Sequence, residues 1–220
     1  MVVKGINPVI EALESGAQVE KIILPKGRRD PRIEKIKELA RKASVPFLFS
    51  PAERIPVAHI TSVKLCDEEE ILKYNLILCL DRVEDPMNLG AIIRSAFAFQ
   101  VPVVTEKRHS PPLNETVARA SAGALFRARI HRTTNLPAFL KRAKEAGYWI
   151  ICAHKEGESL PDFKFPEKSI IVMGSEGKGI RKPIKSLCDF AVRIPMKGEI
   201  DSLNVSVAAA IFLYTASLRL

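Results

Sequence analysis

Residues 170–214 read IIVMGSEGKGIRKPIKSLCDFAVRIPMKGEIDSLNVSVAAAIFLY, and the order of apolar runs and glycines in this stretch decides the fold. The apolar run at 169–173 is typical of a buried strand. Three glycines follow within residues 174–179, and glycine lets the backbone bend tightly and approach a ligand closely. We interpret the segment as a strand followed by a ligand-binding loop, although a plain turn would have the same composition.

The same stretch continues with a second strand and a helix. The run at 191–194 predicts a short strand that ends at the Pro and Gly of residues 195–198. Residues 205–218 have the apolar spacing of a helix, and Ser202 stands where an N-cap is expected. Two strand ends and a helix start would gather backbone N–H and C=O groups, which suits the neutral edge of adenine. Ordinary connections in a parallel sheet are the alternative interpretation.

A second stretch with a similar organisation begins at residue 76. Residues 76–80 form a β-rich apolar run that leads into a helix predicted at 91–99, with Asn88 as its cap. Arg94 is expected near the positive end of this helix, where a guanidinium can hold an RNA phosphate through two hydrogen bonds. A surface ion pair is the alternative for this arginine.

Strand and helix patterns alternate from residue 76 to the C-terminus, which predicts an α/β fold with an open parallel sheet covered on both faces. Before it, two strand and two helix patterns predict a small α/β module. An acidic segment, Asp67 to Glu70, separates the two regions. We therefore expect an N-terminal domain at 1–65, a linker at 66–75 and a C-terminal domain at 76–220.

Composition and charge narrow the class of protein. Lys and Arg number 34 against 25 Asp and Glu, so the net charge is +9 and a polyanionic partner is expected. No apolar run approaches the length of a bilayer span, and no signal peptide is recognisable, so a cytoplasmic protein is expected. The cysteines and histidines show no metal-ligand spacing, which predicts a metal-free protein with reduced cysteines.

Two groups of basic side chains are candidates for RNA contact. One lies in the basic segment between residues 106 and 132, and the other follows the first predicted strand of the N-terminal module. Lys and Arg side chains at such positions can neutralise phosphates of an RNA backbone, although a solvated surface is equally compatible with the charge alone. The candidate RNA-binding residues are Lys107, Arg108, Arg119, Arg28 and Arg29.

Residues 81–96, 170–180, 194–198 and 202–208 resemble, in order and spacing, the three motifs of the SpoU-type RNA ribose 2'-O-methyltransferases of the SPOUT superfamily. The resemblance implies a C-terminal domain with a deep trefoil knot, although the general rule is against knots. It also implies S-adenosylmethionine as cofactor and a homodimer. The N-terminal segment resembles the RNA-binding domain of the ribosomal-RNA branch, which implies methylation of a guanosine in 23S rRNA.

The resemblance also implies roles for single residues. The implied catalytic residues are Arg94, Asn88, Glu176, Ser202 and Asn204. The cofactor would be held by the backbone around Gly174, Ile194, Met196 and Leu203. A guanidinium stays protonated in proteins and is a poor proton acceptor, so we expect Arg94 to clamp a phosphate and orient the hydroxyl.

Two other functions are compatible with the same motifs. The first is methylation of transfer RNA, which the additional N-terminal module and the lack of a basic extension after Tyr214 disfavour. The second is a non-enzymatic RNA-binding or ribosome-assembly protein that keeps the fold. Binding of S-adenosylmethionine would separate the second from an enzyme.

Overall fold

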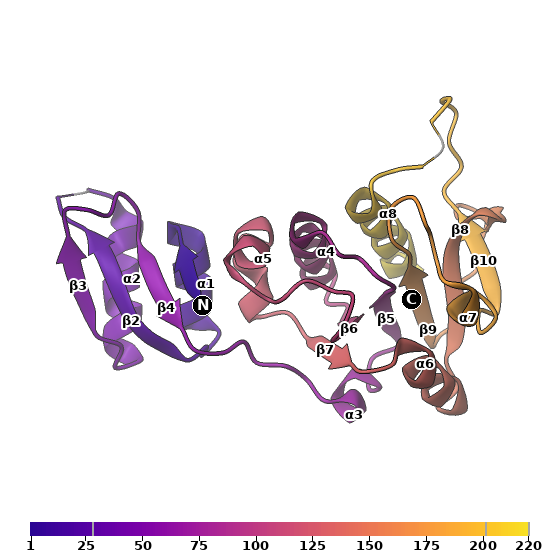
Figure 1. Ribbon diagram of the computed structural model, residues 1–220, viewed down its shortest axis with the longest axis horizontal. Coiled ribbons are helices and arrows are strands. Elements are labelled where there is room, and N and C mark those ends of the chain that lie inside the picture. The colour runs from indigo at the N-terminus through magenta and orange to yellow at the C-terminus, as the bar shows by residue number, and fades with distance from the viewer. Residues whose placement is uncertain (28, 201, 220) are drawn as a thin grey trace.

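The computed structural model describes residues 1–27, 29–200 and 202–219. Its strands form two sheets, a four-stranded sheet near the N-terminus and a six-stranded sheet in the rest of the chain. The small sheet lies at one end of the molecule, and helices α1 (Ile6–Glu14) and α5 (Glu115–Ala120) lie between the two sheets (Figure 1). The predicted α/β fold class is confirmed. No helix in the described ranges is long and apolar enough to cross a membrane.

The N-terminal module has the strand order β1-β4-β2-β3, in which β2 and β3 are parallel and the other two pairs are antiparallel. Asp30 caps its second helix, because the carboxylate accepts a hydrogen bond from Arg32 N at 3.0 Å and Pro31 occupies the first helical position. Besides α1, the elements are β1 (Val2–Lys4), β2 (Val19–Pro25), α2 (Pro31–Lys42), β3 (Phe47–Ser50) and β4 (Val57–Ile60).

The larger sheet is wholly parallel, in the order β10-β8-β9-β5-β6-β7. Its two central strands, β5 and β9, are buried along their whole length. The strands are β5 (Leu76–Leu80), β6 (Val103–Glu106), β7 (Ile130–Thr133), β8 (Trp149–Ser159), β9 (Ser169–Met173) and β10 (Phe190–Arg193). The remaining helices are α3 (Glu68–Ile71), α4 (Pro86–Ala98), η1 (Ala124–Phe126), α6 (Leu136–Glu145), α7 (Lys182–Lys185) and α8 (Val205–Ser217).

Helices cover both faces of this sheet, as expected for a parallel sheet (Figure 1). Helices α4, α5 and α8 lie on one face and share a core with the N-terminal module, while α6 and α7 pack on the other face. Gly90 allows α4 and α5 to approach closely, because a Cβ there would lie 2.4 Å from the Cβ of Ala120. The chain runs outward from β5 through β6 to β7 and then crosses to the other side of β9. In such sheets, ligands bind where the strand order reverses, at the carboxyl ends of the strands.

The C-terminal segment returns from the edge of the sheet to its centre. After β10, at the edge, the chain runs back to α8, which packs beside α4. A trefoil knot requires such a return of the chain. The knot itself stays a prediction, and it concerns the path of this segment relative to the loop between β9 and α7. The return also places the start of α8 next to the ends of β5 and β9.

One expectation about the cysteines is wrong. Cys152 of β8 and Cys188, which follows α7, form a disulfide with a Cα–Cα distance of 6.0 Å. The bond ties the segment between α7 and β10 to β8. Cys66 and Cys79 are free, and Cys79 is a buried core residue. Burial raises the pKa of the Cys79 thiol well above its ordinary value.

Candidate active site

A cavity of about 850 Å³ lies at the carboxyl ends of β9 and β10 and beside the middle of β8. Its walls are the loop after β9, the segment between β10 and α8, and the first turns of α8. All four residues predicted to hold a cofactor line this cavity, namely Gly174, Ile194, Met196 and Leu203. Three segments that are distant in sequence thus form one concave site, as the quoted stretch predicts.

The loop after β9 is held closed by its own backbone. Ser175 and Gly179 form an isolated bridge, with Gly179 N donating to Ser175 O at 2.9 Å. Gly177 has a φ of 75°, a left-handed conformation that glycine adopts without strain. A Cβ at Gly174 would lie only 2.3 Å from the carbonyl carbon of Gly179. The loop can therefore pack back on itself only with glycine at position 174.

The segment between β10 and α8 offers free backbone groups to the cavity. In the described part of the chain, the N–H and C=O groups of Ile194, Met196 and Leu203 take part in no hydrogen bond. Unpaired backbone groups in a concave site can bind the edge of a heterocyclic base. The cavity therefore has the donors and acceptors that a purine ligand requires.

Beside this cavity, three polar side chains from three elements meet in what we call the amide–carboxylate cluster (Asn88, Glu176 and Asn204). Asn88 Nδ2 donates to Glu176 Oε1 at 2.9 Å, and Asn204 Nδ2 donates to the same oxygen at 2.8 Å. Asn204 Nδ2 also lies 2.9 Å from Asn88 Oδ1. The structure thus brings together three of the five predicted catalytic residues.

Both helix starts at this cluster differ from the prediction. Asp85 caps α4, since its carboxylate accepts a hydrogen bond from Asn88 N at 2.7 Å, so α4 begins before Asn88. Asn204 caps α8 by accepting from Ser206 N at 2.9 Å, whereas Ser202 makes no cap. Ser202 is exposed and lines the cavity. The corrected caps leave the amide of Asn88 free to reach Glu176 and fix Asn204 beside it.

Arg94 lies apart from the amide–carboxylate cluster. It is exposed on α4, and its guanidinium has no partner in the described ranges. Asn88 precedes it by six residues, which places the two side chains about 120° apart around the helix axis and about 9 Å apart along it. Met87, one heptad before Arg94, is 51% exposed on the same face of α4. Arg94 therefore belongs to an outward face that also carries apolar surface.

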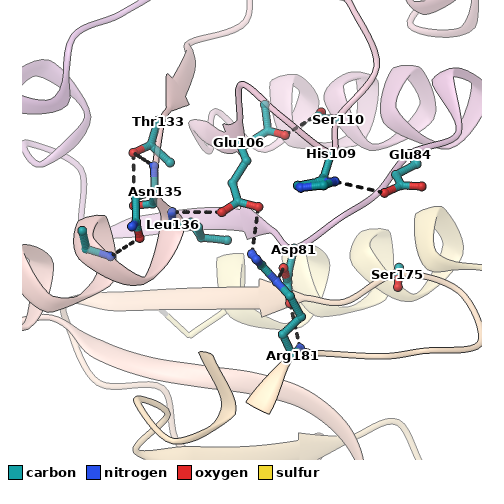
Figure 2. A network of polar contacts seen from close by, with 12 residues as sticks. Asp81, Glu84, Glu106, His109, Ser110, Thr133, Asn135, Leu136, Ser175 and Arg181 are labelled. Atoms are coloured by element: carbon teal, nitrogen blue, oxygen red, sulfur yellow. Dashed lines mark hydrogen bonds and ion pairs between the residues drawn. The ribbon is translucent and has the colours of Figure 1, made fainter. Parts of the chain in front are cut away.

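An ion network of Asp81, Glu106 and Arg181 holds the end of the loop after β9 in place (Figure 2). No local sequence pattern predicts this network. Arg181 Nε donates to Asp81 Oδ1 at 2.6 Å, and Arg181 Nη2 donates to Glu106 Oε2 at 2.8 Å. Asp81 is fully buried and also accepts a hydrogen bond from Arg181 N. Burial lowers the pKa of Arg181, but the hydrogen bonds to Glu106 and Asp81 outweigh it and the pKa is raised. Arg181 therefore stays charged and joins the loop to the ends of β5 and β6.

The candidate RNA-binding side chains fall into two sets. Four of these side chains are exposed and have no ion-pair partner in the described ranges, namely Lys107, Arg108, Arg119 and Arg29. Arg28 lies outside the described residues. Two other arginines of the basic segment have structural contacts: Arg127 pairs with Glu11 at 3.1 Å, and Arg132 donates to the carbonyl of Lys107 at 3.1 Å. Among described residues, no group of three or more His, Cys, Asp or Glu side chains could hold a metal ion.

Comparison with known proteins identifies the family. Residues 75–214 match the model of the SpoU rRNA Methylase family, and residues 2–55 match a domain described as RNA 2'-O ribose methyltransferase substrate binding. An uncharacterized tRNA/rRNA methyltransferase of Archaeoglobus fulgidus is 40% identical over 96% of each chain. A TrmH family tRNA/rRNA methyltransferase of Staphylococcus saprophyticus is 34% identical over 97% of this chain and 94% of its own.

Solved structures share the fold. The SpoU methyltransferase AviRb of Streptomyces viridochromogenes, in complex with AdoMet, matches with a TM-score of 0.85 and 24% identity, over 99% of this chain and 89% of its own. The TrmH/SpoU tRNA modifying enzyme of A. aeolicus matches with a TM-score of 0.59 and 28% identity, over 69% of this chain and 80% of its own. The two family models together match most of the chain, and the two relatives are 40% and 34% identical to it over nearly its whole length. The chain therefore belongs to the SpoU/TrmH family of RNA methyltransferases.

Proposed function

We propose that this protein transfers a methyl group from S-adenosylmethionine to a ribose 2'-hydroxyl of RNA. The observation that carries the proposal is the cavity of free backbone groups beside the amide–carboxylate cluster. When bound, S-adenosylmethionine supplies an electrophilic methyl group on a sulfonium. The backbone at Gly174, Ile194, Met196 and Leu203 would hold it, and its positively charged end suits the side of the cavity formed by Glu176.

The cluster would act mainly by positioning. Attack by a hydroxyl oxygen on a methyl group demands a nearly linear arrangement of three atoms, so orientation accounts for much of the rate. Asn88 and Asn204 hold Glu176 in one place from two helices, while Ser202 lines the same cavity and has a hydroxyl free to contact the substrate. Arg94 would clamp an RNA phosphate, with the proton leaving through phosphate or water. Lysine in place of Arg94 should not restore full activity, because it lacks the bidentate fork.

We propose further that the active unit is a homodimer built on the outward face of α4 and α8. This face carries four exposed apolar side chains, Met87, Val207, Tyr214 and Leu218, on two helices that pack together. Exposed apolar surface of this kind is typical of an interface. Because Arg94 lies on the same face and away from its own cluster, we propose that it serves the site of the partner subunit.

Mixing two inactive variants tests this arrangement. Arg94→Ala and Glu176→Ala homodimers should each lose nearly all activity. After unfolding and refolding as an equal mixture, half of the dimers are mixed, and each mixed dimer has one complete site if Arg94 acts on the partner. Methyl transfer should then recover to about a quarter of the wild-type value. If Arg94 serves its own subunit, the mixture should stay inactive, and the proposal would be wrong.

The substrate we propose is a guanosine of 23S rRNA. The substrate-binding match at residues 2–55 supports this, since the tRNA modifying enzyme of A. aeolicus aligns with only 69% of the chain. We propose residues 1–65 as an RNA-binding domain, 66–75 as a linker and 76–220 as the methyltransferase domain. The exposed, unpaired Lys107, Arg108, Arg119 and Arg29 would contact the RNA backbone, and Arg28 is proposed from sequence alone.

Two measurements test the proposed function. Calorimetry should show S-adenosylmethionine binding with one site per chain, and a purely RNA-binding protein of this fold would show none. Mass spectrometry of ribosomal RNA from cells with and without the gene should then show one ribose methyl that depends on the protein. If every ribosomal ribose methyl persists while one in transfer RNA disappears, the substrate assignment is wrong and the reaction type stands.

A further inference from the structure

A second, smaller cavity of about 240 Å³ adjoins the first. The two share four wall residues, Ser175, Glu176, Lys178 and Val205, but the smaller one is bordered by Asn88 and by the segment between β5 and α4. Ile194 and Met196 line only the larger cavity. A group bound there would sit next to the amide–carboxylate cluster without occupying the larger cavity.

Arg82 lines this smaller cavity in a strained backbone conformation. Its φ is 56°, in the left-handed region that non-glycine residues rarely adopt. The preceding residue, Asp81, is fully buried and fixed by Arg181, so the chain is held where it leaves β5. Strain of this kind persists where the surrounding structure imposes it, and it gathers at functional sites. Here the strained backbone places Arg82 in the wall of the smaller cavity, which Asn88 and Glu176 also line.

The guanidinium of Arg82 has no partner among the described residues. Its Nε is buried without a hydrogen-bond acceptor, and no other described residue forms a hydrogen bond or ion pair with this side chain. Three acidic residues line the cavity, and each has another partner. Asp85 caps α4, Glu84 lies 3.8 Å from His109 (Figure 2), and Glu176 accepts hydrogen bonds from Asn88 and Asn204. A buried donor without an acceptor is unfavourable, and an arginine fork matches a phosphate well. The side chain of Arg82 is therefore available to bind an anion.

We propose that Arg82 binds the phosphate next to the target ribose, so that the ribose lies between Arg82 and the amide–carboxylate cluster. The inference rests on the proposed function and adds a substrate-binding residue that the three motifs alone do not single out. Lys178, on the same wall, would add positive charge beside the phosphate. Arg82 and Arg94 would then contact different phosphates of one strand.

Replacing Arg82 by glycine separates this role from a structural one. Glycine relieves the strained φ, so the variant should be at least as stable as the wild type, while the phosphate contact is lost. Ser44→Gly is the matched control, because Ser44 has a φ of 55° and follows α2 in the N-terminal module, away from both cavities. The Tm of each variant, its Kd for S-adenosylmethionine and its Kd for unmodified ribosomal RNA transcribed in vitro would be measured.

We expect Arg82→Gly to weaken RNA binding about tenfold and to reduce the slope of log Kd against log salt by about one, as for one lost phosphate contact. Arg82→Lys should recover part of both, and Ser44→Gly should change neither. Affinity for S-adenosylmethionine should stay within about twofold in all variants. A weakened affinity for S-adenosylmethionine would mean that Arg82 holds the donor, and a lowered Tm would mean a structural role.

Either of those results would overturn the proposal, as would unchanged RNA binding in Arg82→Gly. Failure of the proposed function would look different. In that case the wild type itself would not methylate a ribose, whichever residue stands at position 82.

Discussion

Replacing Arg181 by alanine is expected to lower the free energy of unfolding by about 3 kcal/mol. The change removes the cation that pairs with two buried carboxylates, since Asp81 is fully buried and Glu106 is 6% exposed. Both would then carry unpaired charge in the interior. Because Arg181 is itself 26% exposed, water can screen part of this effect, and the expected loss lies at the low end for a broken buried pair.

Urea unfolding of three variants measures this effect. Arg181→Lys keeps the charge but cannot reach both carboxylates as the guanidinium does, so its loss should fall between wild type and alanine. Arg29→Ala removes an exposed arginine that has no partner in the described part of the chain, and it should change the free energy of unfolding by less than about 0.5 kcal/mol. A loss below about 1 kcal/mol in Arg181→Ala would show that the network does not hold the loop.

Replacing Gly174 by alanine is expected to weaken S-adenosylmethionine binding at least a hundredfold, which is about 2.8 kcal/mol. The added Cβ would lie 2.3 Å from the carbonyl carbon of Gly179 and 2.5 Å from Ile180 N, both backbone atoms. Backbone cannot rotate out of the way as a flexible side chain can, so the loop must open. The wall of the larger cavity that carries Ser175 and Glu176 would then move.

Gly198→Ala is the matched control for this substitution. Gly198 lines the same cavity, but no heavy atom lies within 4 Å of its Cβ position, and its φ is not in the left-handed region. Calorimetry should therefore give an affinity within about threefold of wild type for Gly198→Ala. Equal losses in the two variants would mean that the clash at Gly174 is not the cause.

Much of the fold could be predicted from the sequence because its signals are local. The all-apolar runs at β5 and β9 predict strands that are buried on both faces, and the glycines after β9 predict the loop that follows this strand. The short edge strand β7 has no apolar run or alternation that would predict it, since only its first and last residues, Ile130 and Thr133, are buried. The start of α4 was placed late because Asn88 is as good a cap residue as Asp85, and nothing local decides between them.

The non-local contacts of the site could not be predicted from pattern. Asp81 and Arg181 are a hundred residues apart, and their meeting depends on β5 and β9 pairing side by side. The disulfide between Cys152 and Cys188 spans 36 residues and matches no local spacing. Arg94 has the residue type that a phosphate clamp needs, but only the helix phase shows that it points outward. Likewise, the strain at Arg82 appears only in the backbone angles.

The most direct test of the whole account is to identify the product. The protein would be incubated with unmodified 23S rRNA and methyl-labelled S-adenosylmethionine, and the RNA digested to nucleosides and analysed by mass spectrometry. Label is expected in 2'-O-methylguanosine, and Glu176→Ala is expected to lose that label. Label on a base, or no label in any RNA although S-adenosylmethionine binds, would contradict it.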